Sequence, residues 1–201
     1  VLNLGGTVSV RAESGELRSI SSSEELPVTP FVVKEINLAS RSDVDDEVMS
    51  DLQGLSELEA LYLQETSVSD RGLANLTDEG REPLPALKRI YLSDTDISEA
   101  GLQHLAGSGD LEGLLLHDTQ VSRADVLTRF PNLNMLAIAH GPLEAGSMSV
   151  VKSLPNLGRL EIDADVTTAD FINLSLAASP VIIDGNARVN CPSTSEMVWP
   201  P

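Results

Sequence analysis

The chain has few aromatic residues and a single cysteine. Aromatics make up 3% of its 201 residues, although hydrophobic residues as a whole make up 41%. A hydrophobic core must therefore consist mainly of Leu, Val, Ile and Ala, which suits thin, regular layers. Because Cys191 is the sole cysteine, the sequence excludes an intrachain disulfide and a metal site made of several cysteines.

Basic residues are also scarce. The chain has 13 Lys and Arg against 31 Asp and Glu, for a formal charge of -18. A surface of this sign repels phosphate backbones and anionic lipids, so we expect no nucleic acid partner. No apolar run reaches the length of about 18 residues that a membrane helix needs, so we expect no membrane insertion of this segment. The compartment stays open; an exported or envelope-attached location is slightly favoured, because a chain that starts at Val1 without a methionine suggests a fragment.

Signatures of catalysis are missing from the sequence as well. There is no glycine-rich phosphate loop, no HExxH and no serine elbow, and the three histidines have no catalytic context. Cys191 lies between Asn190 and Pro192 near the end of the chain, where we expect an inert or structural thiol. We therefore expect no enzyme activity and no cofactor.

The sequence does contain an internal repeat. Segments starting at Leu58, Leu87 and Leu111 share the pattern LxxLxLxxTx(V/I)S. With weaker copies and a final strand, successive starts are 22 to 29 residues apart, at Val33, Leu58, Leu87, Leu111, Leu133, Leu157 and Val181. This spacing lies in or at the edge of the range of leucine-rich repeats.

Each repeat predicts a short strand, a turn and a helix. The alternation in Leu61–Leu63 directs both leucines to one side of a strand and Tyr62 to the other. Leu73 and Leu76 are spaced as one face of a helical turn requires. Serines precede the helical segments as predicted N-caps, at Ser69, Ser98 and Ser122. Since one repeat cannot bury its leucines alone, the copies must stack, with a parallel sheet on a concave face and helices on the convex face.

The repeats resemble those of bacterial leucine-rich repeat proteins, whose motif is LxxLxLxxTxVTDxGLxxL and whose fold is the ribonuclease-inhibitor-like horseshoe. The resemblance covers residues 33 to about 176 and implies a right-handed α/β solenoid of about six repeats. We expect a single domain, with an N-terminal cap at 1–32, repeats at 33–180 and a C-terminal strand and tail at 181–201. The fifth repeat departs from the motif at Gly141 and Pro142, and residues 12–25 resemble a loop or hairpin tip.

The repeat register predicts which side chains lie on the concave face. The fifth-position column contains Tyr62, Tyr91 and Leu115, which should form one amphipathic stripe, unless the tyrosines serve only to stack on each other. The eighth-position column contains Glu65, Asp94 and Asp118, a ladder that either is a solvated rim or favours a basic partner. Arg89 lies beside both columns. We expect no metal site, although the acidic ladder, or His117 with His140, could supply ligands.

These features favour a non-catalytic protein–protein interaction module that binds a partner, possibly a basic one, on its concave face. The alternative is a structural or spacer domain of a larger envelope-associated or anchored protein. A third class, an enzyme or metal-dependent binder built on the acidic ladder, is the least supported. The identity of the partner and the oligomeric state stay open.

Overall fold

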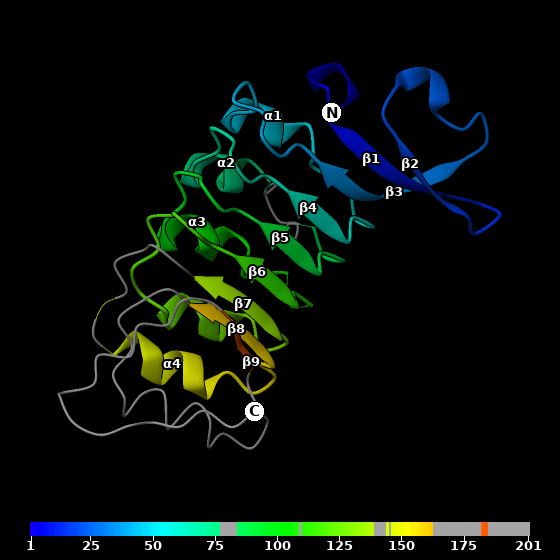
Figure 1. The fold of residues 1–201 in the computed structure, drawn as a ribbon. Coiled ribbons are helices and arrows are strands. Elements are labelled where there is room, and N and C mark those ends of the chain that lie inside the picture. Colours follow the sequence, from blue (N-terminus) through cyan, green and yellow to red (C-terminus); the bar gives the residue numbers. More distant parts are fainter. Residues whose placement is uncertain (77–83, 109, 139–143, 145, 163–181, 185–201) are drawn as a thin grey trace.

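The structure of the protein is a computed structural model. It describes residues 1–76, 84–108, 110–138, 144, 146–162 and 182–184. Their strands form one nine-stranded sheet in the order β2-β1-β3-β4-β5-β6-β7-β8-β9. From β3 onward, the order in the sheet is therefore the order in the chain. Figure 1 shows the strands following one another from the N-terminal end, with the helices along one side of the sheet.

The N-terminal segment is the antiparallel part of the sheet. β1 pairs antiparallel with β2 on one side and with β3 on the other. Val8, Val10 and Ile20 are buried, so this segment adds a hydrophobic layer to the end of the array. The elements here are η1 (Leu2–Leu4), β1 (Thr7–Ala12), β2 (Leu17–Ile20), η2 (Ser23–Glu25) and β3 (Phe31–Asn37). Within the predicted loop at 12–25, the hairpin tip is confirmed at 13–16, whereas residues 17–20 are a strand.

The parallel strands lie where the repeat pattern predicts them. They are β4 (Ala60–Tyr62), β5 (Arg89–Tyr91), β6 (Gly113–Leu115), β7 (Met135–Ile138), β8 (Arg159–Ile162) and β9 (Ile182–Asp184). Their pairing places the fourth-position residues side by side, at Leu61, Ile90, Leu114, Leu136 and Leu160. Each of these five is 0% exposed, which confirms the predicted inward row. This row forms the core face of the sheet.

A short helical segment follows most strands. These are α1 (Asp46–Ser50), α2 (Asp70–Asn75), α3 (Glu99–His104), η3 (Asp125–Arg129) and α4 (Ser147–Ser153). The predicted caps of α2 and α3 are confirmed, because Ser69 accepts the amide of Arg71 and Ser98 accepts that of Ala100. No helix among the described residues is long and apolar enough to cross a membrane.

The predicted cap at Ser122 is wrong. The repeat that starts at Leu111 contains the 3-10 helix η3, which begins after Ala124 and has no side-chain cap. The hydroxyl of Ser122 donates to Glu99 of the preceding repeat at 3.1 Å, as those of Ser69 and Ser98 donate to Asp46 and Asp70. Its side chain is therefore used between repeats.

The threonine of the motif has a structural explanation. The hydroxyls of Thr66, Thr95 and Thr119 each donate to the carbonyl three residues earlier, at 2.6, 2.5 and 2.9 Å. All three threonines are buried. A buried carbonyl without a partner costs free energy, so the hydroxyl satisfies the backbone where the chain leaves the strand.

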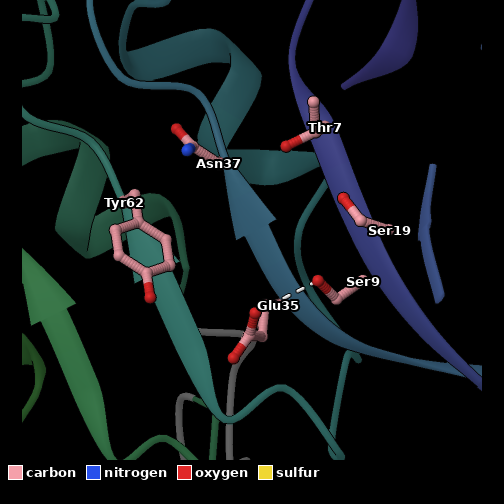
Figure 2. A pocket seen from close by; sticks show the side chains of 6 residues that line it. All are labelled: Thr7, Ser9, Ser19, Glu35, Asn37 and Tyr62. Atoms are coloured by element: carbon pink, nitrogen blue, oxygen red, sulfur yellow. Dashed lines mark hydrogen bonds between the residues drawn. The ribbon is translucent and has the colours of Figure 1, made fainter. Parts of the chain in front are cut away.

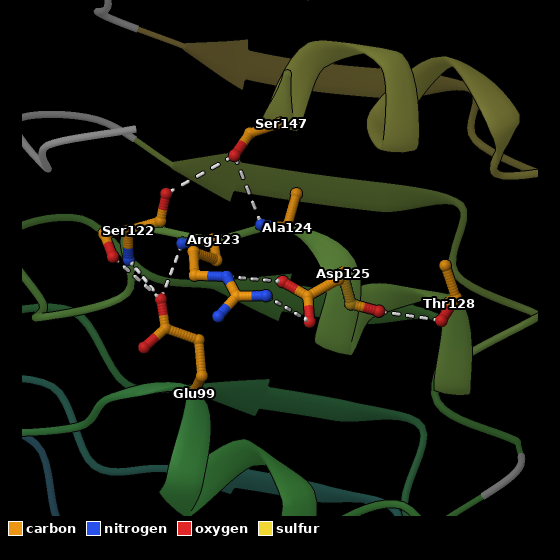
Figure 3. Close-up of polar contacts among 7 residues, drawn as sticks. All are labelled: Glu99, Ser122, Arg123, Ala124, Asp125, Thr128 and Ser147. Carbon is orange, nitrogen blue, oxygen red and sulfur yellow. Dashed lines mark hydrogen bonds and ion pairs between the residues drawn. The ribbon is translucent and has the colours of Figure 1, made fainter. Parts of the chain in front are cut away.

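A ladder of carboxylates links successive helical segments. Asp46 accepts the amide and hydroxyl of Ser69, both at 2.7 Å, and Asp70 accepts those of Ser98 at 2.8 and 2.5 Å. Glu99 continues the ladder, accepting the amide of Ser122 at 2.6 Å (Figure 3). We call Asp46, Asp70 and Glu99 the carboxylate ladder.

The carboxylate ladder ends at the repeat that starts at Leu111. The residue after Ser122 is Arg123, a base where the earlier repeats have an acid. The next link is made by Ser147 of α4, whose hydroxyl donates to the carbonyl of Ser122 at 3.4 Å and lies 3.4 Å from the amide of Ala124 (Figure 3). Neutral hydrogen bonds of this length are weaker than those of a carboxylate, so the contact between these segments has less polar support.

Candidate functional site

The face of the sheet opposite the helices is made of two rows of side chains. The pairing aligns a fifth-position row, at Asn37, Tyr62, Tyr91, Leu115, Ala137 and Glu161. It also aligns a third-position row, at Glu35, Ala60, Arg89, Gly113, Met135 and Arg159. We call these two rows the open face. Side chains alternate along a strand, so both rows point away from the buried leucines.

Tyr62 and Tyr91 stack on each other in the middle of the open face. Their ring centroids are 4.6 Å apart and the ring planes differ by 13°. Burial raises the pKa of Tyr62, and the neighbouring Tyr91 and Glu35 add to that rise. Both rings remain partly exposed, and Leu115 lies on the next strand of the same row. The stack brings the predicted tyrosines into direct contact and fixes their orientation.

Arg89 lies across the open face rather than extending from it. Its guanidinium contacts Glu35 at 3.3 Å, two strands away, and the small side chain of Ala60 lies between them in the row. A Cβ placed on Gly113 would lie 3.2 Å from Cγ of Arg89. The small residues on both sides therefore leave room for the arginine to lie along the row.

The three predicted acids lie beside the open face, at the turns that follow β4, β5 and β6. Glu65, Asp94 and Asp118 have positive φ angles of 57°, 55° and 50°. Short polar residues such as Asp tolerate this left-handed conformation better than most, which gives Asp94 and Asp118 a conformational explanation. All three are exposed. Among the described residues, no group of three His, Cys, Asp or Glu side chains could hold a metal ion.

His117 and Glu161 form a further contact beside the open face. Their side chains approach to 3.8 Å, from Nε2 to Oε1. Ala137 lies between β6 and β8 in the same row as Glu161, and its small side chain leaves space for this approach. His140, the other histidine considered as a ligand, lies outside the described residues, as do Gly141, Pro142 and Cys191.

Lys34 is a buried lysine with two acidic partners that the sequence did not indicate. Its side chain is 8% exposed, and Nζ lies 2.9 Å from Glu57 and 3.0 Å from Glu59. The hydrogen bonds to Glu57 and Glu59 raise the pKa of Lys34, and the same lysine lowers the pKa of Glu59. Lysine is rarely buried unless it is paired, so hydropathy alone would place this residue on the surface.

A polar pocket of about 310 Å³ opens at the N-terminal end of the open face. Six residues from four strands line it, namely Thr7, Ser9, Ser19, Glu35, Asn37 and Tyr62 (Figure 2). Of these, only Tyr62 is among the predicted site residues. The pocket could not be found from the repeat register, because β1 and β2 lie outside the repeats and pair antiparallel.

The chain is a mixed α/β protein with a predominantly parallel sheet. No family model and no curated protein matches it. Solved structures that are similar include the leiomodin-1 actin-binding site 2, at 17% identity and a TM-score of 0.47 over 60% of this chain and 78% of that chain. An internalin (inlF) from Listeria monocytogenes has 18% identity and a TM-score of 0.47, and the match covers 75% of this chain and 48% of that chain. Internalin C2 from the same species has 17% identity and a TM-score of 0.41, over 80% and 88%. Similarity at this level supports no statement about function.

Proposed function

We propose that the chain is a non-catalytic protein-interaction module that binds a partner on the open face. The observation that carries this proposal is the partly exposed stack of Tyr62 and Tyr91, with Leu115 next in the row. Tyrosine is favoured at interfaces because it buries a large rigid area and keeps a polar tip. In this proposal the chain is a right-handed leucine-rich repeat solenoid, and the open face is its concave side.

The fixed geometry of the tyrosine stack favours binding more than a flexible surface would. The two rings already hold each other, so a partner that covers them orders few additional side chains, which lowers the entropic cost of association. Arg89 adds a guanidinium beside the rings, and arginine is common at the centres of interfaces.

The charge of the chain favours a basic partner. Glu65, Asp94 and Asp118 lie along one border of the open face, and the whole chain carries -18. Complementary charge mainly accelerates encounter and is screened by salt. We therefore propose that the tyrosines anchor the partner, whereas the acids steer it and contribute little once it is bound.

The test is partner capture from the native host with the full chain as bait. Replacing Tyr62 and Tyr91 together by alanine should abolish the capture of a partner that the wild type retains. The matched control is Val28→Ala, because Val28 is an exposed apolar residue outside the open face and should not affect capture. Capture that is unchanged in the double variant would contradict the proposal.

A spacer role is the second candidate, and one observation favours it. Two acids of the open face have partners within the chain, Glu35 in an ion pair with Arg89 and Glu161 in a 3.8 Å contact with His117. A surface whose groups satisfy one another has less need of a partner. In that case the double tyrosine variant should lower the free energy of unfolding, through the lost stack, while capture stays the same.

A further inference from the structure

We propose that the polar pocket beside Tyr62 binds a single neutral sugar ring. The pocket combines one aromatic wall, several hydroxyls, a carboxylate and a carboxamide in a space of about 310 Å³ (Figure 2). A pyranose ring presents complementary chemistry, with hydroxyls that both donate and accept and a flat C–H face. A protein partner on the open face is not required for this inference.

The six lining residues lie in two adjacent rows. Ser19, Ser9 and Glu35 pair across β2, β1 and β3, and Thr7, Asn37 and Tyr62 pair across β1, β3 and β4. Each row thus runs across three neighbouring strands, about 4.8 Å apart. A guest in the pocket can meet polar groups from both rows at once.

The hollow coincides with an irregularity in the sheet. Ser9 pairs with Glu35 but Val10 pairs with Val33, so Lys34 is the extra residue of a bulge. Its side chain is directed into the protein, where it is buried against Glu57 and Glu59. Bulges increase local twist and redirect side chains, and they are common next to binding sites. The ion pairs of Lys34 thus lie at the bulge next to Glu35, one of the residues that line the pocket.

Tyr62 supplies a flat wall on the side of the pocket towards β4. One face of its ring is covered by Tyr91, which lies on β5. Since β3 and β5 lie on opposite sides of β4, the other face is directed to the β3 side, where the pocket lies. The stack fixes the orientation of the Tyr62 ring, so a sugar ring can pack against its free face without displacing a side chain.

The charge balance favours a neutral guest over a cation. Glu35 is the sole ionised residue that lines the pocket, and both of its oxygens are engaged. Arg89 contacts one oxygen at 3.3 Å, and the hydroxyl of Ser9 donates to the other at 3.1 Å. A cation would have to compete with Arg89 for this carboxylate. A neutral hydroxyl can share the carboxylate without breaking the ion pair.

The size and lining of the pocket narrow the ligand class. Pockets for small molecules usually measure about 300–1,000 Å³ and are mainly apolar. This one is at the lower limit in volume, and five of its six lining residues are polar without an aromatic ring. An apolar ligand would leave these groups without water or partners. One sugar unit fits both constraints.

The direct test is an NMR titration of the isotope-labelled chain with the methyl glycosides of glucose, galactose, mannose and N-acetylglucosamine. At least one should shift the amide signals of residues 7–9, 19, 35–37 and 62, with a dissociation constant on the order of 1 mM, as expected for so small a ligand. Glycerol, which has hydroxyls but no ring, should not produce these shifts. Nα-acetyl-arginine amide tests for a cation in the same pocket. The proposal is overturned if no glycoside shifts these signals, or if only the arginine derivative does.

Variants of Tyr62 and Glu35 distinguish the contribution of the aromatic ring to glycoside binding from that of the carboxylate charge. Tyr62→Ala should weaken glycoside binding by about tenfold, because packing of the sugar against the ring contributes roughly a factor of ten to the affinity. Tyr62→Phe keeps the ring and should retain the binding. Glu35→Gln should weaken glycoside binding less than Tyr62→Ala does, because an amide oxygen still accepts a hydrogen bond. A loss in Glu35→Gln larger than that in Tyr62→Ala would mean that the site depends on the carboxylate rather than on the ring, and would contradict the proposal.

Leu115→Ala distinguishes this inference from the proposed function. Leu115 lies in the tyrosine row but does not line the pocket, so its removal should weaken partner capture and leave glycoside binding unchanged. If the glycosides fail while capture depends on Leu115, the sugar site is wrong and the interaction module stands. If glycosides bind but substitutions on the open face do not affect partner capture, the sugar site stands and the interaction module is wrong. Thermal unfolding of each variant establishes that it is folded.

Discussion

Among single residues, Asp70 makes the most testable contribution to stability. It lies at the start of α2 and accepts two hydrogen bonds from Ser98 of the next repeat. Hydrogen bonds to a charged group contribute about 1.5–3 kcal/mol in favourable cases, and Asp70 is only partly buried. We therefore take the lower end of that range.

Replacing Asp70 by alanine should lower the free energy of unfolding by about 2 kcal/mol, because the amide and hydroxyl of Ser98 lose their acceptor. Urea unfolding at pH 7 measures this. Asp43→Ala is the control, because Asp43 is an exposed acid in the turn before α1 and should change stability by no more than about 0.5 kcal/mol. Equal effects of the two substitutions would show that the carboxylate ladder does not stabilise the fold.

Glu99 should make stability depend on pH. Burial alone would raise the pKa of its carboxyl, but hydrogen bonds from its own amide and those of Arg123 and Ser122 outweigh burial, so the pKa is lowered from 4.5. The unfolded chain then binds the proton more readily. The stabilisation is present above pH 4.5 and is lost as the pH falls through the lowered pKa of the folded state.

Glu99→Gln should therefore be less stable than the wild type at pH 7, and the difference should shrink between pH 4.5 and more acidic conditions. Urea unfolding of both proteins across this range measures it. The difference in free energy of unfolding between the variant and the wild type removes the contribution of the other acids, which titrate in both proteins. A difference that stays constant from pH 7 to pH 3 would mean that Glu99 is not held as a carboxylate by these amides.

At the scale of elements, sequence and structure agree on the strands and on α2 and α3, and differ on the helical segment after Ser122. The strand around Leu61 could be predicted because alternation and burial depend on local pattern. The 3-10 form of η3 could not, because Ser122 is the counterpart of the serines that cap α2 and α3, so the local pattern does not distinguish the three segments. The polar pocket escaped prediction because it needs the antiparallel pairing of β1 with β3. Contacts between segments carry no local signal.

The need for glycine in the repeat motif also comes from contact with the neighbouring helix. In an exposed helix, alanine in place of Gly101 would stabilise α3 by about 0.5–1 kcal/mol. Here an added Cβ would collide with the carboxylate of Asp70 and lie 3.1 Å from its Cα. Gly101→Ala should therefore destabilise the protein, by about 1–3 kcal/mol, as overpacking does.

The sign of this effect is the prediction, and urea unfolding measures it. In the Asp70→Ala background the added cost of Gly101→Ala should be smaller, because the colliding carboxylate is absent. Strict additivity of the two substitutions, or stabilisation by Gly101→Ala alone, would disprove the close contact between α2 and α3.

At the scale of the whole molecule, the main contacts between elements join neighbours in the sheet or neighbours among the helices. A strand in the middle therefore has two interfaces, whereas β2 at the N-terminal end has β1 alone as its partner among the described strands. In such an array, stability is a sum of local terms, and opening an end costs one interface. The same loss of packing should then have different consequences at different places.

Ile20 and Ile90 allow a matched comparison, because they are the same residue, 2% and 0% exposed, in β2 and β5. Replacing either by alanine removes about 2–5 kcal/mol of packing. For Ile20→Ala, native-state hydrogen exchange should become faster only in β1 and β2, since the end can open alone. For Ile90→Ala it should become faster in β4, β5 and β6 together, because opening the centre breaks two interfaces. The same exchange pattern in both variants would mean that the described residues unfold as one cooperative unit.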